Sequence, residues 1–136
     1  MGSASVIVLD THVLLWWLSN PEKLSLKAAE AIETAMNDRA IYVSSISSWE
    51  IAMLSARGRL ELTIDVADWV AAAESLPFVY FIPVNNRIAL KSVSLPDFAW
   101  PDPADRIIIA TALSLRATLI TRDRRILDYP HVQSRW

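Results

Sequence analysis

The sequence has no cysteine, only two glycines and only two histidines among its 136 residues. The absence of cysteine excludes a disulfide framework, a thiolate zinc site, an iron–sulfur cluster and a cysteine nucleophile. The glycines, Gly2 and Gly58, are far apart, which excludes a glycine-rich loop for phosphates or dinucleotides. With only His12 and His131, a His-rich metal site is not expected. A chain without cysteine suits a reducing cytosol, and we expect a cytoplasmic protein.

Long apolar runs and an excess of basic charge are also missing. No segment reaches the ~20 apolar residues of a membrane-spanning helix. Asp10 interrupts the apolar start and no basic residue precedes it, so we expect no signal peptide. The 13 basic and 15 acidic residues give a net charge of −2, unlike proteins with a wide basic face for nucleic acid. Hydrophobic residues make up 53%, which together with the length predicts one globular domain over residues 1–136.

Short apolar runs alternate with longer amphipathic segments. The short runs, typical of strands buried on both faces, are residues 6–9, 41–43, 79–82 and 118–121, with a weaker fifth at 131–135. Helical spacing is found over residues 25–36, 47–57, 65–74, 86–93 and 103–116, with Asp65 as an expected N-cap, and another helix begins near Thr11. This alternation predicts a three-layer α/β domain with a mostly parallel sheet, whose ligands bind at the carboxyl edge of the strands.

Four acidic residues are expected near that edge. Asp10 follows the first strand directly, and Asp123 lies two residues after the run at 118–121. Asp105 is in the first turn of the helix that leads into that run. Glu50 is on an apolar face of its helix, where an unpaired charge would cost several kcal/mol.

Each acid also has a purely structural interpretation. Asp10 and Asp123 could cap the helical turns that follow them, and Asp102 with Asp105 resembles a capping box. Glu50 could pair with an arginine. Together, however, acids at one edge raise one another's pKa unless a cation lies among them, and no nearby lysine or histidine serves all of them. An all-carboxylate set suits Mg²⁺ or Mn²⁺, which favours metal-assisted cleavage of a phosphate ester.

Four segments in order then carry a family resemblance. Residues 9–18, 48–52, 102–110 and 121–130 resemble the motifs of PIN-domain ribonucleases, specifically the VapC-type toxins of bacterial toxin–antitoxin systems. The resemblance implies a PIN fold with a parallel sheet of four or five strands flanked by helices. It implies an endoribonuclease toxin dependent on Mg²⁺ or Mn²⁺, which cleaves RNA, forms a homodimer and is neutralised by a VapB-type antitoxin.

The same resemblance implies roles for particular residues. The residues implied to gather around the metal and to catalyse cleavage are Asp10, Glu50, Asp105 and Asp123, with Thr11, Thr121 and Asp102 in supporting positions. Trp100 and Pro101 stand where the subgroup often has a His-Arg pair, and Ala104 where it has Phe. These departures affect substrate preference and packing more than the metal site.

Several other side chains have competing interpretations. Arg106 and Arg122 flank the acids, and we expect them to bind RNA phosphates. For Arg124 and Arg125, a solvated charge run or an antitoxin contact is favoured over binding of RNA phosphates. Because Trp16 and Trp17 are adjacent, one is expected in the core and the other at an interface, with RNA base stacking as an alternative.

Other functional classes fit less well. His12 could serve as a base, but a structural or supporting role is expected in a metal hydrolase. A non-catalytic module that keeps the fold would be expected to have lost one of the four acids, and none is lost. Aspartyl phosphotransfer enzymes and receiver domains fit poorly because position 12 is His and no lysine follows Lys91.

Overall fold

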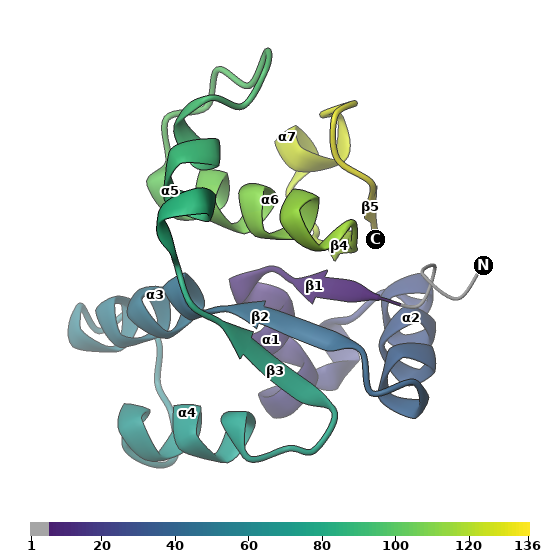
Figure 1. Cartoon of the computed structure of the whole chain (residues 1–136). Helices are drawn as coiled ribbons and strands as arrows, with labels where there is room; N and C mark the ends of the chain where they lie inside the picture. The colour runs from purple at the N-terminus through teal and green to yellow at the C-terminus, as the bar shows by residue number, and fades with distance from the viewer. Residues whose placement is uncertain (1–5) are drawn as a thin grey trace.

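The computed structural model describes residues 6–136, and its centre is a sheet of five parallel strands (Figure 1). The strands are β1 (Ile7–Leu9), β2 (Ile41–Ser44), β3 (Val79–Ile82), β4 (Thr118–Ile120) and β5 (Ser134–Arg135), in the order β3-β2-β1-β4-β5. β1 is central because Ile7 pairs with Ile41 on one side and with Thr118 on the other. The predicted parallel sheet is confirmed, including a fifth strand that is shorter than the run at 131–135.

Helices cover both faces of this sheet. They are α1 (Thr11–Ser19), the 3-10 turn η2 (Pro21–Lys23), α2 (Leu26–Asn37), α3 (Ser45–Ala56), α4 (Val66–Glu74), α5 (Asn86–Val93), α6 (Pro103–Leu115) and α7 (Arg124–Leu127). In Figure 1, α5, α6 and α7 lie on one side of the sheet, and α1, α2 and α4 on the other. The predicted helices are all present, although the side chain of Asp65 forms no hydrogen bond at its N-cap position.

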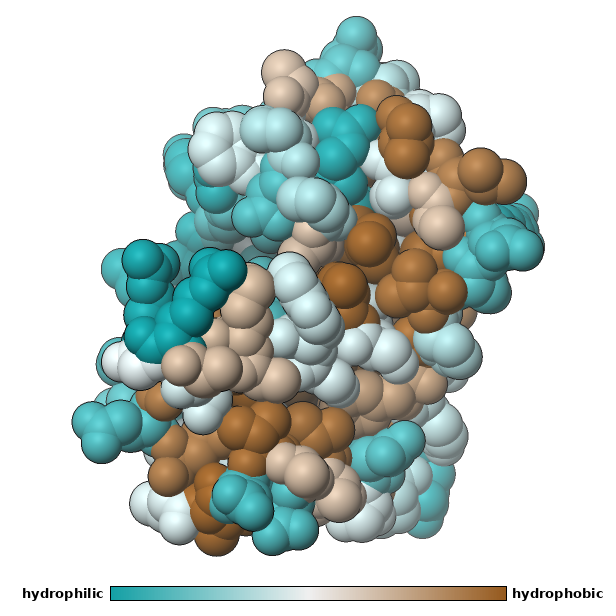
Figure 2. Space-filling view, turned by 90° about the vertical axis from the view of Figure 1, so that its left-hand side faces the viewer, coloured by the Kyte–Doolittle hydropathy of each residue, from teal (hydrophilic) through white to brown (hydrophobic). Residues whose placement is uncertain are grey.

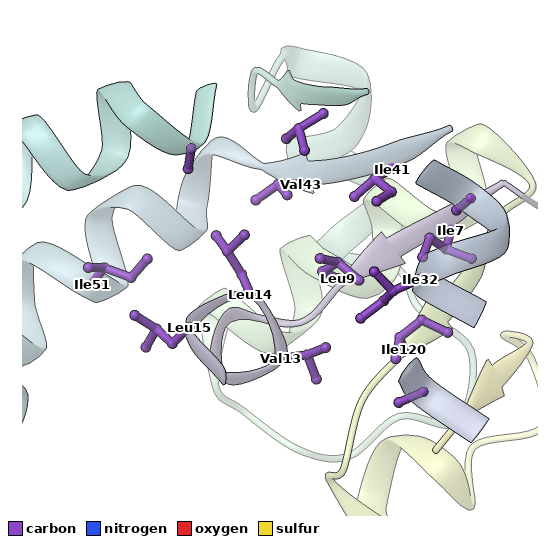
Figure 3. Packing of buried hydrophobic residues seen from close by; sticks show 14 of the residues in the cluster. Ile7, Leu9, Val13, Leu14, Leu15, Ile32, Ile41, Val43, Ile51 and Ile120 are labelled. Atoms are coloured by element: carbon purple, nitrogen blue, oxygen red, sulfur yellow. The ribbon is translucent and has the colours of Figure 1, made fainter. Parts of the chain in front are cut away.

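The two faces of the sheet bury two separate hydrophobic clusters. Successive side chains of a strand point to opposite faces, so Ile7 and Leu9 join one cluster while Val8 joins the other. The first cluster also contains buried residues of α1, α2, α3 and α4, some of which are seen in Figure 3. The second is made largely by α6 and by residues after β4. This division confirms the predicted three layers.

The outer surface carries exposed apolar side chains on the side where α3, α4 and α5 lie. Figure 2 shows apolar residues gathered in groups on this side of the molecule. Exposed members of α3 and α5 include Trp49, Leu90 and Val93, which are 56%, 72% and 78% exposed. Across residues 6–136, no helix has the length and apolar character needed to cross a bilayer.

Candidate active site

An open pocket of about 370 Å³ lies at the carboxyl edge of the sheet. Five acidic residues from four separate segments line it: Asp10, Glu50, Asp102, Asp105 and Asp123. Asp10 follows β1 at the start of α1, Glu50 comes from α3, and Asp123 lies between β4 and α7. Asp102 and Asp105 come from the start of α6. The structure therefore brings together all four acids that the sequence places near this edge.

Both oxygens of Asp10 are oriented by neighbouring donors. The backbone N–H of Thr11 donates to Oδ1 at 2.8 Å, as expected for a residue that caps α1. The hydroxyl of Thr121 donates to Oδ2 at 2.6 Å, and this hydroxyl also accepts from the backbone N–H of Asp123 at 3.0 Å. Thr121 is fully buried. The capping interpretation of Asp10 is thus correct but incomplete, because the same carboxylate is held against the pocket.

Glu50 is held by hydroxyl groups and not by an arginine. The Thr11 hydroxyl donates to Glu50 Oε1. Since that hydroxyl has one hydrogen, Ser47 Oγ, 2.8 Å away, is the donor in its bond to Thr11 Oγ1. The described residues contain no ion pair of Glu50, so the arginine alternative is wrong. Sequence reasoning missed Ser47, although its position three residues before Glu50 places both on one helical face.

Asp102 and Asp105 have different tasks at the start of α6. Asp102 Oδ1 accepts from the backbone N–H groups of Ala104 at 2.9 Å and Asp105 at 3.3 Å, which confirms it as an N-cap. The Asp105 side chain is only 14% exposed. Burial, followed by the charges of the neighbouring carboxylates, raises the pKa of Asp105 to about 7.

The remaining acid is paired with an arginine. Arg125 donates to both oxygens of Asp123, from Nε at 3.0 Å and from Nη2 at 2.7 Å. This pairing lowers the pKa of Asp123. The same guanidinium lies 3.6 Å from the ring centroid of Trp100 and 3.9 Å from Asp105 Oδ2. Arg125 is therefore a cation of the pocket itself, which the expectation of a solvated or antitoxin-contacting residue did not include.

Arg125 alone does not neutralise the carboxylates of this pocket. Burial raises the pKa of Asp10, and the nearby Asp123 charge adds to that effect. Burial also raises the pKa of Glu50, with the charges of Asp10 and Asp102 acting in the same direction. Burial and the neighbouring carboxylates thus disfavour the charged forms of Asp10, Glu50 and Asp105, and a bound cation would offset this effect.

The two arginines expected to bind RNA have different positions. Arg106 donates to the backbone carbonyls of Ser92 at 2.8 Å, Phe98 at 2.7 Å and Trp100 at 2.9 Å. Its guanidinium holds the segment between α5 and α6 and does not line the acidic pocket, so the structure adds no support to its predicted role with substrate phosphates. Arg122 lines the acidic pocket and is exposed, as a phosphate-binding residue would be.

The donor set fits a hard divalent cation. Carboxylate and hydroxyl oxygens face the pocket, and the only ring nitrogen that lines it belongs to exposed His12. Within residues 6–136, no three acidic or histidine side chains form a ready-made cage around one ion. Mg²⁺ is commonly bound by one or two carboxylates while it keeps several waters, so an open pocket of this kind suits it.

Comparison with known proteins shows which family has this architecture. Residues 7–132 match the PIN domain. The chain is 35% identical over 127 residues to Ribonuclease VapC22 of Mycobacterium tuberculosis (strain ATCC 25618 / H37Rv), covering 93% of this chain and 94% of that protein. The chain belongs to the VapC family of PIN-domain proteins.

Solved structures agree with this VapC fold. The crystal structure of VapBC2 from Rickettsia felis bound to a promoter DNA fragment matches with a TM-score of 0.70 and 14% identity, over 96% of this chain and 97% of that chain. DNA-bound VapBC from Salmonella typhimurium matches with a TM-score of 0.68 and 14% identity, over 96% of both chains. At these identities the likeness concerns the fold, and it confirms the predicted PIN-like sheet.

Proposed function

We propose that this VapC-family chain is a metal-dependent endoribonuclease toxin that hydrolyses RNA phosphodiester bonds. The observation that carries the proposal is the pocket in which Asp10, Glu50, Asp105 and Asp123 converge from four separate segments. The similarity to a protein named as a ribonuclease supports RNA as the substrate class. An RNA target also supports action in the cytoplasm.

Asp10, Asp105 and Asp123 would hold Mg²⁺, with Mn²⁺ as a substitute, and Glu50 would ligate it or orient the attacking water. When bound, the ion supplies an activated water and stabilises charge on the phosphate and the leaving oxygen. The Thr11 N–H and the Thr121 hydroxyl fix both oxygens of Asp10. Exposed Arg122 is positioned to bind an RNA phosphate beside the acids.

We propose a VapB-type antitoxin as the neutralising partner. The matched structures are toxin–antitoxin complexes by name, which supports a partner of the same kind for this chain. The exposed apolar residues of α3 and α5 support homodimer formation. Because the family match spans residues 7–132, we also propose that residues 1–136 form a single PIN domain.

Cleavage of total cellular RNA by purified, antitoxin-free protein tests the activity. We expect discrete fragments with Mg²⁺ or Mn²⁺ and none with EDTA. Asp105→Asn should abolish the fragments and keep the fold, measured by circular dichroism. Asp65→Asn is the matched control, because Asp65 is exposed and its side chain forms no capping bond. Full activity of the Asp105→Asn protein would show that Asp105 has no part in the mechanism. Cleavage in EDTA would show that cleavage does not depend on a metal.

A further inference from the structure

A second pocket, of about 340 Å³, adjoins the acidic one through a shared residue. It is lined by Trp16, Lys23, Leu24, Ser25, Arg122 and Trp136. These residues come from α1, from η2 and the residues before α2, and from segments after β4 and β5. Arg122 lines both pockets, so a chain-like ligand could contact the two in succession.

Aromatic rings connect the two pockets. The ring centroids of Trp16 and Trp136 are 5.8 Å apart with planes tilted by 57°. On its other side, Trp16 lies 5.8 Å from the ring of His12, which lines the acidic pocket. The neighbouring Trp17 packs against the core and against Phe78. Trp17 therefore packs against the core while Trp16 lines the second pocket, and the predicted interface position of one tryptophan stays a prediction.

The charge of the second pocket is opposite to that of the first. No acidic side chain lines it, while Lys23 and Arg122 do. Neither of these cations has an ion-pair partner among the described residues. The Arg122 guanidinium carbon lies 5.8 Å from the ring centroid of Trp16, so cation and ring are presented together. A basic groove with aromatic faces is the arrangement that binds single-stranded nucleic acid.

We propose that this second pocket binds a nucleotide of single-stranded RNA next to the bond that is cleaved. Its base stacks on Trp16 and contacts the edge of the tilted Trp136 ring, and its phosphate is bound by Lys23 and Arg122. The inference rests on the proposed ribonuclease activity, because RNA is the substrate that would cross from one pocket to the other. RNA is favoured over a protein partner because the cations and the link to the acids match a phosphate backbone. Stacking is tolerant of base identity, so the pocket would contribute affinity more than sequence preference.

Binding can be measured without cleavage. A fluorescein-labelled 2′-O-methyl oligonucleotide of mixed sequence is titrated with protein in EDTA, and fluorescence anisotropy is recorded. We expect Trp16→Ala to weaken binding by about tenfold, in line with the loss of one base–aromatic stack. Trp16→Phe should retain most of the affinity, and Lys23→Ala should weaken it and reduce its salt dependence.

Matched controls come from elsewhere on the surface. Tyr80→Ala removes an exposed aromatic ring of β3, and Lys91→Ala an exposed lysine of α5. Both should bind the oligonucleotide like the unmodified chain. Lys23 is exposed, so its variant should fold even if Trp16→Ala does not. Photo-cross-linking with a 5-iodouridine oligonucleotide should attach the base to Trp16 or Trp136, identified by mass spectrometry.

The outcomes separate this proposal from the activity on which it rests. Suppose that Trp16→Ala and Lys23→Ala both bind the oligonucleotide like the unmodified chain, and that metal-dependent cleavage is intact. This result would contradict RNA binding by the second pocket and would leave the proposed ribonuclease activity supported. Weakened binding with the expected cross-link would support the pocket even if no RNA were cleaved. If the unmodified chain bound no oligonucleotide but its purified antitoxin protected Trp16 fluorescence from quenching by acrylamide, the proposal would be overturned and the pocket assigned to the protein partner.

Discussion

The acidic pocket has two pairs of carboxylates that are held in different ways. Asp10 and Glu50, the hydroxyl-held pair, accept hydrogen bonds from Thr121 and Thr11. Asp105 and Asp123, the arginine-held pair, lie beside Arg125. A neutral hydroxyl orients a carboxylate and leaves its charge in place, whereas a guanidinium neutralises it. The first pair therefore has no internal counter-ion, whereas Asp123 of the second pair already has one, which an external cation must displace or share.

The largest effect is expected from removing charge in the hydroxyl-held pair. Asp10→Asn should reduce metal-dependent RNA cleavage by more than about a hundredfold, since even outer partners of metal ligands cost about ten- to a hundredfold. Asp123→Asn should cost less, because Arg125 already offsets that charge. Initial rates on a fluorogenic RNA measure both. Equal losses of cleavage rate in the two variants would show that both pairs of carboxylates contribute equally to cleavage.

Removing a hydroxyl should have the next largest effect. Thr121→Val keeps the shape of the side chain but removes the hydroxyl that donates to Asp10 Oδ2 at 2.6 Å. We expect cleavage to fall about tenfold to a hundredfold, as for other outer partners of metal ligands. Thr118→Val is the control, because among residues 6–136 its hydroxyl forms a hydrogen bond only to Gln133, at 3.5 Å. A Thr121→Val rate equal to that of the control would contradict the orienting role.

Removing Arg125, the cation within the pocket, should strengthen the binding of a metal ion to the carboxylates. In Arg125→Ala, Mn²⁺ should bind about two- to fivefold more tightly, the scale of one exposed ion pair. Isothermal titration calorimetry measures this affinity. Arg124→Ala, which loses only an exposed contact to Asp128 at 3.6 Å, should bind Mn²⁺ like the unmodified chain. Weaker binding in Arg125→Ala would instead mean that the arginine holds Asp123 in position for the metal.

The smallest effect is a pH dependence of stability without metal. Asp105 has a pKa of about 7 in the folded chain and near 3.8 when unfolded. Between these values the folded state keeps a proton that the unfolded state has lost, so stability falls as pH rises through this window and levels off above it. In EDTA we expect Tm to fall by a few degrees between pH 6.5 and 8 (roughly 1 kcal/mol). Asp105→Asn should flatten this slope, and a rising Tm would contradict the assigned shift.

The sequence predicted most of the fold and the acids of the site. Continuous β-branched runs identify parallel strands, and Asp10 comes directly after one such run and Asp123 two residues after another. Parallel strands present their carboxyl ends at one edge, so adjacency to a strand was enough to place these side chains together.

Other contacts depend on irregular segments and could not be predicted in the same way. The partners of Arg106 are backbone carbonyls in and after α5, whose path no local pattern specifies. The stacking of Arg125 on Trp100 joins the turn after β4 to the segment before α6. The position of Arg106 beside the acids therefore suggested RNA contacts, whereas in the folded chain its guanidinium donates to backbone carbonyls.

The pairing of β1 with β4 also affects when the protein becomes active during synthesis. Asp10 is made early, yet the hydroxyl that orients it belongs to Thr121, 111 residues later. A ribosome that has translated only as far as α6 has produced Asp10, Glu50 and Asp105 but not the strand that completes the sheet beside β1. We therefore expect the nascent chain not to cleave the RNA of its own translation until its last strands are in place, and a prematurely terminated product to be inactive.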